Sequence, residues 1–126
     1  MIAALLSISA GASLGAICRW LLGLWLNPYL SLFPLGTLLV NCVGGFLIGI
    51  AFAWFAVHDG ASENMKLLIM TGFLGGLTTF SAFSIEVVNM LQLAYYGRAL
   101  LTILLHLAGS IVCTILGIAL MRAAQS

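Results

Sequence analysis

Four long stretches of the chain consist almost entirely of apolar residues, at about residues 2–26, 34–57, 64–93 and 98–121. A bilayer core about 30 Å thick needs roughly 20 apolar residues in a helix, so each stretch is long enough to cross a membrane. Of the 126 residues, 63% are hydrophobic and 6% are charged, whereas roughly a quarter of the residues in a soluble domain are charged. We therefore expect an all-α membrane protein that forms a single transmembrane domain over residues 1–126.

Short turn-forming segments separate the predicted spans, since their residues favour turns over helix. Asn27-Pro28 ends the first span, His58-Asp59-Gly60 ends the second, and Tyr95-Tyr96-Gly97 connects the third to the fourth. The first span is too long, and lacks the charged leader, for a cleaved signal peptide. Aromatic residues concentrate at membrane interfaces, and several lie near one pair of span ends: Trp20, Trp25, Tyr29, Tyr95 and Tyr96.

Charge and the reactive side chains exclude several function classes. A net charge of +1 provides no basic surface for nucleic acid. The three cysteines, Cys18, Cys42 and Cys113, lie in apolar stretches, where a thiol behaves as a small hydrophobe. His58 and His106 have no ligand partner at metal spacing and belong to no Ser-His-acid set, so we expect neither a zinc site nor an enzyme.

The cations of the loops give little instruction about orientation in the membrane. With four spans, both termini lie on one side, which carries Lys66 and Arg122, while the other side carries Arg98 and, if it reaches the interface, Arg19. Orientation is normally set by excess Lys and Arg in cytoplasmic loops. We therefore predict insertion in both orientations, which permits an antiparallel, dual-topology homodimer. A single orientation set by local effects is the alternative.

Glycines spaced four residues apart let helix backbones approach closely in lipid. Three such pairs predict close helix packing: Gly11 and Gly15, Gly45 and Gly49, and Gly72 and Gly76.

The centre of the third span carries residues that weaken a helix. Gly75 and Gly76 are followed by two threonines and two serines within residues 72–84. We predict a discontinuous helix, since many transport proteins use the backbone groups freed by such a break as ion sites. No lysine follows the glycines, so the segment is not a phosphate loop. An unbroken helix with small residues for packing is the alternative.

Three polar residues within the spans have more than one interpretation, because ionisable groups at membrane depth are costly and usually face protein or water. Arg19 either extends toward the interface or has a structural or vestibule role. Glu86 is a proton-linked carboxylate, a member of a polar track or a buried structural group. Asn41 offers amide donors and an acceptor, and a plain interhelical hydrogen bond is the alternative for it.

Phe80 and Phe83 are three residues apart and share a helix face after the predicted break. An aromatic ring has a positive edge, so two ring edges among hydroxyl groups attract a small dehydrated anion without a fixed cation. Conduction needs such sites, which an ion can both enter and leave. Simple packing is the alternative for this pair.

The motifs together resemble those of one known family. They are Gly15-Ala16 followed by Arg19-Trp20, the run Gly36-Thr37-Leu38-Leu39-Val40-Asn41 with Gly44, and the segment from Thr78 to Ser84. With four spans in about 125 residues, the chain resembles the Fluc (CrcB) fluoride channels over essentially its whole length. That family is described as dual-topology homodimers that export fluoride passively through two pores, with a structural sodium ion at the dimer centre.

The resemblance implies roles for individual residues. It implies that Phe80 and Phe83 line the anion pathway edge-on, that Asn41 donates to fluoride, and that Ser110 is a further polar partner. The backbone carbonyls of Gly75 and Thr78 would hold the sodium ion with their symmetry mates. Four further residues look like the family's polar track: Thr37, Ser81, Glu86 and Thr114. Arg19 looks like the family's vestibule cation.

Two positions depart from the expected family pattern. Ala10 stands where a glycine is expected, which changes little. Ala82 stands where many relatives have a hydroxyl group between the phenylalanines, so a side-chain role is lost there and only a backbone role remains.

The expected function is passive, selective fluoride export across a bacterial inner membrane, which confers fluoride resistance. A proton-coupled small multidrug exporter is the first alternative, but that class relies on a carboxylate in its first span. Residues 2–26 contain no Asp or Glu, and Glu86 is the only one within a span. A structural membrane subunit without transport activity is the second alternative.

Overall fold

The computed structural model describes residues 1–26 and 34–126, and every regular element in these two ranges is helical. The described residues contain four helices long and apolar enough to cross a membrane: Ile2–Leu26, Leu35–Val57, Glu63–Gln92 and Tyr96–Gln125. The predicted all-α fold with four spans is therefore confirmed, and the chain is a multi-pass membrane protein. The predicted turn at Asn27-Pro28 and the aromatic Tyr29 lie outside the described residues.

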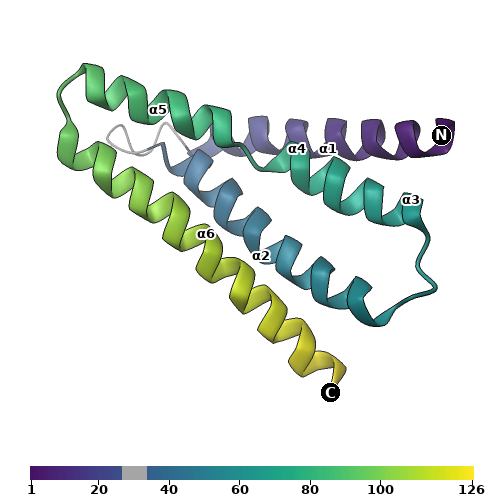
Figure 1. The fold of residues 1–126 in the computed structure, drawn as a ribbon. Coiled ribbons are helices and arrows are strands. Elements are labelled where there is room, and N and C mark those ends of the chain that lie inside the picture. The colour runs from purple at the N-terminus through teal and green to yellow at the C-terminus, as the bar shows by residue number, and fades with distance from the viewer. Residues whose placement is uncertain (27–33) are drawn as a thin grey trace.

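The helices are arranged so that both termini lie toward the same side of the molecule (Figure 1). The connection from α2 (Leu35–Val57) to α3 (Glu63–Lys66) lies toward that side too, and the turn from α5 (Phe80–Gln92) into α6 (Tyr96–Gln125) lies at the opposite side. Helix α1 (Ile2–Leu26) packs along the first half of the third span, while α2 packs along α6. The arrangement agrees with an even number of membrane crossings.

The third span is built from several pieces. Ser62 accepts a hydrogen bond from the backbone amide of Met65 at 3.1 Å and so caps α3. A π-helical segment, Leu67–Leu74, follows α3 and leads into α4, Gly75–Leu77. Thr78 and Thr79 then have extended backbone, with ψ angles of 157° and 118°, before α5 begins. The predicted discontinuity is confirmed, and the alternative of an unbroken helix is wrong.

Threonine side chains stabilise both sides of this break. The Thr78 hydroxyl donates to the carbonyl oxygen of Leu74 at 2.8 Å, which closes the last turn of α4. The Thr79 hydroxyl accepts from the backbone amide of Ala82 at 3.1 Å and is the N-cap of α5. The β-branched threonines also favour extended backbone, so the chain leaves the helix two residues after the glycines.

Glycines allow the helices to approach each other as closely as the sequence predicted. A Cβ atom on Gly15 of α1 would lie 2.1 Å from the carbonyl oxygen of Phe73 in the third span. A Cβ atom on Gly49 of α2 would lie 2.2 Å from the carbonyl oxygen of Thr114 in α6. Neither contact is compatible with a side chain, so these two helix pairs depend on glycine for their packing.

The connection between α5 and α6 differs from the prediction. The chain turns at Ala94, which has a φ of 62°, whereas Tyr96 and Gly97 already belong to α6. The backbone amide of Tyr95 donates to the carbonyl oxygen of Met90 at 2.8 Å, and this bond closes the end of α5. The fourth helix consequently starts before the predicted residue 98 and continues beyond 121, to Gln125.

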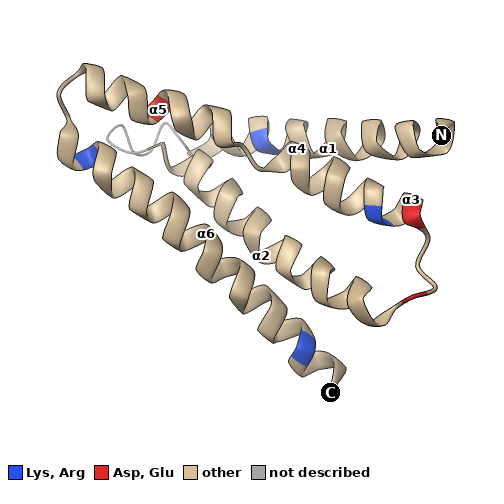
Figure 2. Ribbon diagram, viewed as in Figure 1, with Lys and Arg blue, Asp and Glu red and all other residues tan. Residues whose placement is uncertain are grey.

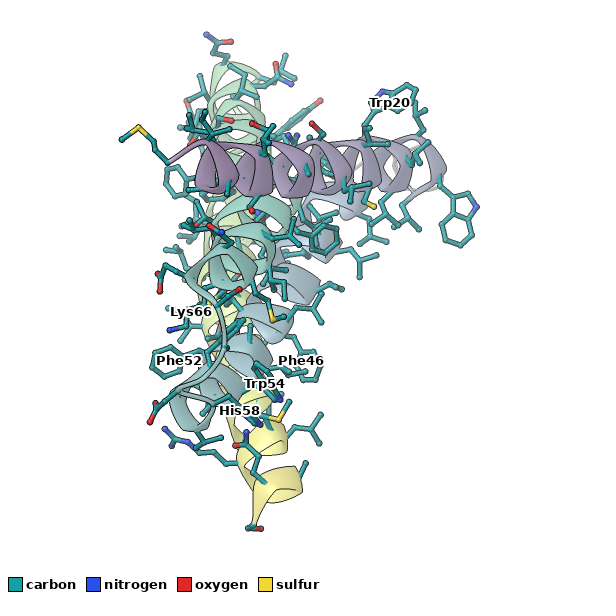
Figure 3. The ribbon with its side chains drawn as sticks, turned by 90° about the vertical axis from the view of Figure 1, so that its right-hand side faces the viewer. Trp20, Phe46, Phe52, Trp54, His58 and Lys66 are labelled. Atoms are coloured by element: carbon teal, nitrogen blue, oxygen red, sulfur yellow. The ribbon has the colours of Figure 1, made fainter. Side chains whose placement is uncertain are left out.

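Most charged side chains lie near the ends of the spans, and the exceptions are Arg19 within α1 and Glu86 in the middle of α5. Most of the length of each helix carries neither cations nor anions (Figure 2). Trp20 is 62% exposed and points away from the other helices, and His58 stacks on Trp54 at the end of α2 with ring centroids 3.9 Å apart (Figure 3). Amphipathic rings of this kind favour the boundary between lipid and water.

Candidate ion pathway

The break in the third span is held by the side-chain amide of Asn41 on α2. The Asn41 Oδ1 atom accepts from the backbone N–H of Thr79 at 2.8 Å, and Nδ2 donates to the carbonyl oxygen of Thr79 at 3.0 Å. One side chain thereby satisfies both backbone polar groups of the extended residue Thr79. Unpaired backbone groups are costly at membrane depth, so Asn41 makes the break tolerable there.

The same bonds release two backbone carbonyls from helical pairing. In a continuous α-helix the amide of Thr79 would donate to Gly75, and the amide of Ala82 would donate to Thr78. These amides donate instead to Asn41 Oδ1 and to the Thr79 hydroxyl. The carbonyls of Gly75 and Thr78, which the sequence resemblance assigns to the sodium ion, thus lose their helical donors at the break.

Arg19 reaches the break from α1. Its Nε atom donates to the carbonyl oxygen of Gly76 in α4 at 3.1 Å, and the side chain is half-buried. The carbonyl end of a helix carries partial negative charge, which a cation stabilises. The structure therefore gives Arg19 a bonding role at the break, in place of simple extension toward the interface.

A cavity of about 400 Å³ lies beside the break. It brings together six residues of the predicted pathway and cation site, Asn41, Gly75, Thr78, Phe80, Phe83 and Ser110, and adds Thr79 and His106. The rings of Phe80 and Phe83 meet edge-to-face, with centroids 5.4 Å apart and planes at 69°. Phe83 is buried, whereas Phe80 is 72% exposed. The ring pair therefore lines the cavity with one inner and one outer member.

A second cavity of about 500 Å³ lies next to the first, and Thr79 lines both. Its lining includes Arg19, Thr37 and Glu86. The Thr37 hydroxyl donates to Glu86 Oε1 at 2.5 Å, while Glu86 Oε2 is buried and has no hydrogen-bond partner among residues 1–26 and 34–126. This cavity is lined by Arg19 and Glu86, the two charged residues that lie farthest from the ends of the predicted spans.

The four residues of the predicted polar track do not lie together in the structure. The Ser81 hydroxyl lies 3.4 Å from the Thr79 hydroxyl, next to the break. The Thr114 hydroxyl donates to the carbonyl oxygen of Ser110 in its own helix at 2.9 Å, where α6 crosses α2. Thr114 is therefore one turn along α6 from the first cavity, and Thr37 and Glu86 belong to the second.

Sequence reasoning missed the parts played by Thr79 and His106. Thr79 contributes its backbone, which no side-chain motif reveals. His106 is 5% exposed, its Nδ1 atom lies 3.0 Å from Asn41 Nδ2, and its ring stacks on Phe83 with centroids 4.4 Å apart. An ionisable residue in an apolar span is the available signal, but the spacing of metal ligands does not indicate a contact with an amide on another helix.

The sequence of the chain matches the family model described as "CrcB-like protein, Camphor Resistance (CrcB)" over residues 6–118. The chain belongs to the CrcB family. The match includes all residues that line the two cavities, so the CrcB assignment covers the whole candidate site.

Relatives of this CrcB chain carry the description "Fluoride-specific ion channel FluC". One from Acinetobacter baumannii is 56% identical over 115 residues, which cover 91% of this chain and 90% of the relative. One from Acinetobacter baylyi is 54% identical over 118 residues, covering 94% and 93%. One from Pseudomonas aeruginosa is 54% identical over 114 residues, covering 90% of each chain.

Proposed function

We propose that this chain is a passive, fluoride-selective channel that exports fluoride across the bacterial inner membrane and so confers fluoride resistance. The observation that carries the proposal is the cavity in which the Phe80 and Phe83 rings lie beside a broken membrane helix. Ring edges and hydroxyl groups attract a small anion without trapping it at a fixed cation. Membership of the CrcB family and the descriptions of its relatives support fluoride as that anion.

The proposed pathway is lined by Phe80, Phe83, Asn41 and Ser110. Both amide hydrogens of Asn41 are directed at acceptors, one at the Thr79 carbonyl and one at His106. A fluoride ion that binds the Asn41 amide competes with these acceptors, which keeps the binding weak. Weak binding suits conduction, because a tightly held ion would block the pathway.

The proposed polar track continues through Thr37, Ser81, Glu86 and Thr114, with Arg19 as the cation of the vestibule. Support comes from the second cavity, where Arg19 and the hydrogen-bonded pair of Thr37 and Glu86 share one lining. A half-buried arginine raises the local concentration of anions, and the partner of Arg19 at Gly76 is a neutral carbonyl oxygen, so this bond does not cancel its charge.

The proposed assembly is an antiparallel, dual-topology homodimer. Phe80 lies beside a mid-span break and yet its ring is 72% exposed, so a second copy is the natural cover for the open side of the first cavity. The cations near the span ends, Lys66 and Arg122 on one side and Arg98 on the other, give only a small bias, which supports insertion in both orientations. Reporter fusions at Ser126 test the topology: signal from both sides is expected, and signal from one side alone would contradict it.

A structural sodium ion at the dimer centre is part of the proposal. The carbonyls of Gly75 and Thr78 fit it, because both lack their helical donors at the break and both residues line the first cavity. Oxygen donors suit a small hard cation. When bound, the ion would supply positive charge that holds the carbonyls of two copies together.

Ion efflux from liposomes tests the proposed function. Purified protein is reconstituted in liposomes loaded with potassium fluoride and potassium chloride, and valinomycin then lets potassium balance the charge of a passively moving anion. We expect rapid loss of fluoride and retention of chloride. Retention of both anions would contradict a channel, and efflux that instead requires a proton gradient would favour the exporter.

A further inference from the structure

The contact between Asn41 and His106 has a defined direction. Thr79 presents an N–H donor 2.8 Å from one end of the Asn41 amide, so that end must be the oxygen, Oδ1. The other end, Nδ2, carries two hydrogens; one is directed at the Thr79 carbonyl and the other at His106 Nδ1, each at 3.0 Å. Since Nδ2 can only donate, His106 Nδ1 must carry a lone pair and no hydrogen.

The surroundings hold the imidazole in this position. His106 is 5% exposed on α6, and its ring lies against that of Phe83 on α5 with centroids 4.4 Å apart and planes at 30°. Phe83 in turn meets Phe80 edge-to-face. One side chain therefore contacts both the amide that holds the break and the inner ring of the proposed anion pathway.

We propose that His106 is a positioning residue of the pathway, whose Nδ1 lone pair fixes the Asn41 amide and whose ring face fixes the plane of Phe83. The role rests on the proposed channel function for its effect on flux. The neutral imidazole carries its hydrogen on Nε2. Without the Nδ1 acceptor, one part-buried hydrogen of Asn41 loses its partner, and only the two bonds to Thr79 then hold the amide.

Nitrogen NMR of the imidazole tests the geometry directly and needs no transport assay. The chain has two histidines, so the exposed His58 is replaced by glutamine, and His106 is the remaining one. We expect Nδ1 without hydrogen and Nε2 with hydrogen at neutral pH, and a displaced Nδ1 signal in Asn41→Leu. A hydrogen on Nδ1, or an Nδ1 signal that stays the same in Asn41→Leu, would overturn the proposal.

Two variants separate positioning from mere packing. His106→Asn places an amide oxygen near the position of Nδ1, whereas His106→Leu keeps similar bulk without an acceptor. Loss of a buried hydrogen bond corresponds to about a tenfold change, so we expect fluoride efflux to fall about tenfold in His106→Leu and to be largely restored in His106→Asn. Equal efflux in the two variants would overturn the positioning role.

The two readouts keep this inference apart from the channel proposal. If the unmodified protein moves no fluoride, the proposed function fails, and the NMR result still decides the hydrogen-bond geometry. If His106→Leu does not fold, the NMR comparison of the unmodified chain with Asn41→Leu carries the test alone.

Discussion

The Nε atom of Arg19 on α1 donates to the carbonyl oxygen of Gly76 on α4 at 3.1 Å. Together with the amide of Asn41, which pairs with the Thr79 peptide, this bond attaches the broken third span to its two neighbours. Hydrogen bonds from α1 and α2 therefore hold the break in place. The residues that line the first cavity beside the break are therefore tied to both α1 and α2.

Replacing Arg19 by glutamine removes the charge that stabilises the end of α4. We expect the free energy of unfolding to fall by about 2 kcal/mol, the usual range for a hydrogen bond to a charged group. Unfolding in mixed detergent micelles measures it. Arg122→Gln, at an exposed position near the end of α6, is the control, and an equal effect in both variants would contradict this role of Arg19.

Replacing Phe80 by isoleucine removes a ring edge without opening the core of one copy of the chain, because within that copy the side chain is 72% exposed. We expect fluoride efflux to fall about tenfold, equivalent to about 1.4 kcal/mol, with unfolding close to that of the unmodified chain. Phe52→Ile changes another exposed ring, on α2 and away from the break. If the two variants conduct alike, Phe80 is not part of the pathway.

Replacing Asn41 by aspartate keeps the acceptor for the Thr79 amide but removes both donors. The new oxygen then faces two acceptors, the Thr79 carbonyl and His106 Nδ1. We expect a stability loss of about 2–3 kcal/mol, because buried groups are left unsatisfied, and a large fall in fluoride efflux. Asn64→Asp makes the same chemical change at an exposed site in α3 and should alter neither property.

Replacing Gly15 by alanine tests the close packing of α1. The new Cβ atom would lie 2.1 Å from the Phe73 carbonyl oxygen, so the helices must separate, at a cost of about 1–3 kcal/mol. Within residues 1–26 and 34–126, no neighbouring atom lies within 4 Å of the position that a Cβ atom on Gly97 of α6 would take. Gly97→Ala should therefore stabilise the helix by about 0.5–1 kcal/mol, and thermal unfolding in detergent separates the two outcomes.

The sequence alone predicted the helices and the interruption of the third one, because hydropathy and helix propensity are properties of neighbouring residues. Span 2–26 agrees with α1, Ile2–Leu26. The same local reasoning placed the last turn at Tyr95-Tyr96-Gly97, although the chain turns at Ala94. A glycine signals a turn only statistically, and the hydrogen bond from Tyr95 to Met90 decided where α5 ends.

The partners of the polar residues depended on tertiary structure. Asn41 and His106 were visible as polar positions in apolar spans, but they are 65 residues apart, and Asn41 and Thr79 are 38 apart. Arg19 and Gly76 are 57 apart. The distance between the helices and the height at which they cross decide which of these groups come into contact. Glycine contacts between whole helices determine that crossing.

The sequence by itself determined that this chain crosses a membrane four times and that its third span is interrupted. Only the tertiary structure decided that one amide from α2 satisfies the interrupted peptide and that an imidazole from α6 holds this amide. The physical reason is the difference in range. Burial in lipid acts on each segment separately, whereas a hydrogen bond needs two groups within about 3 Å of each other.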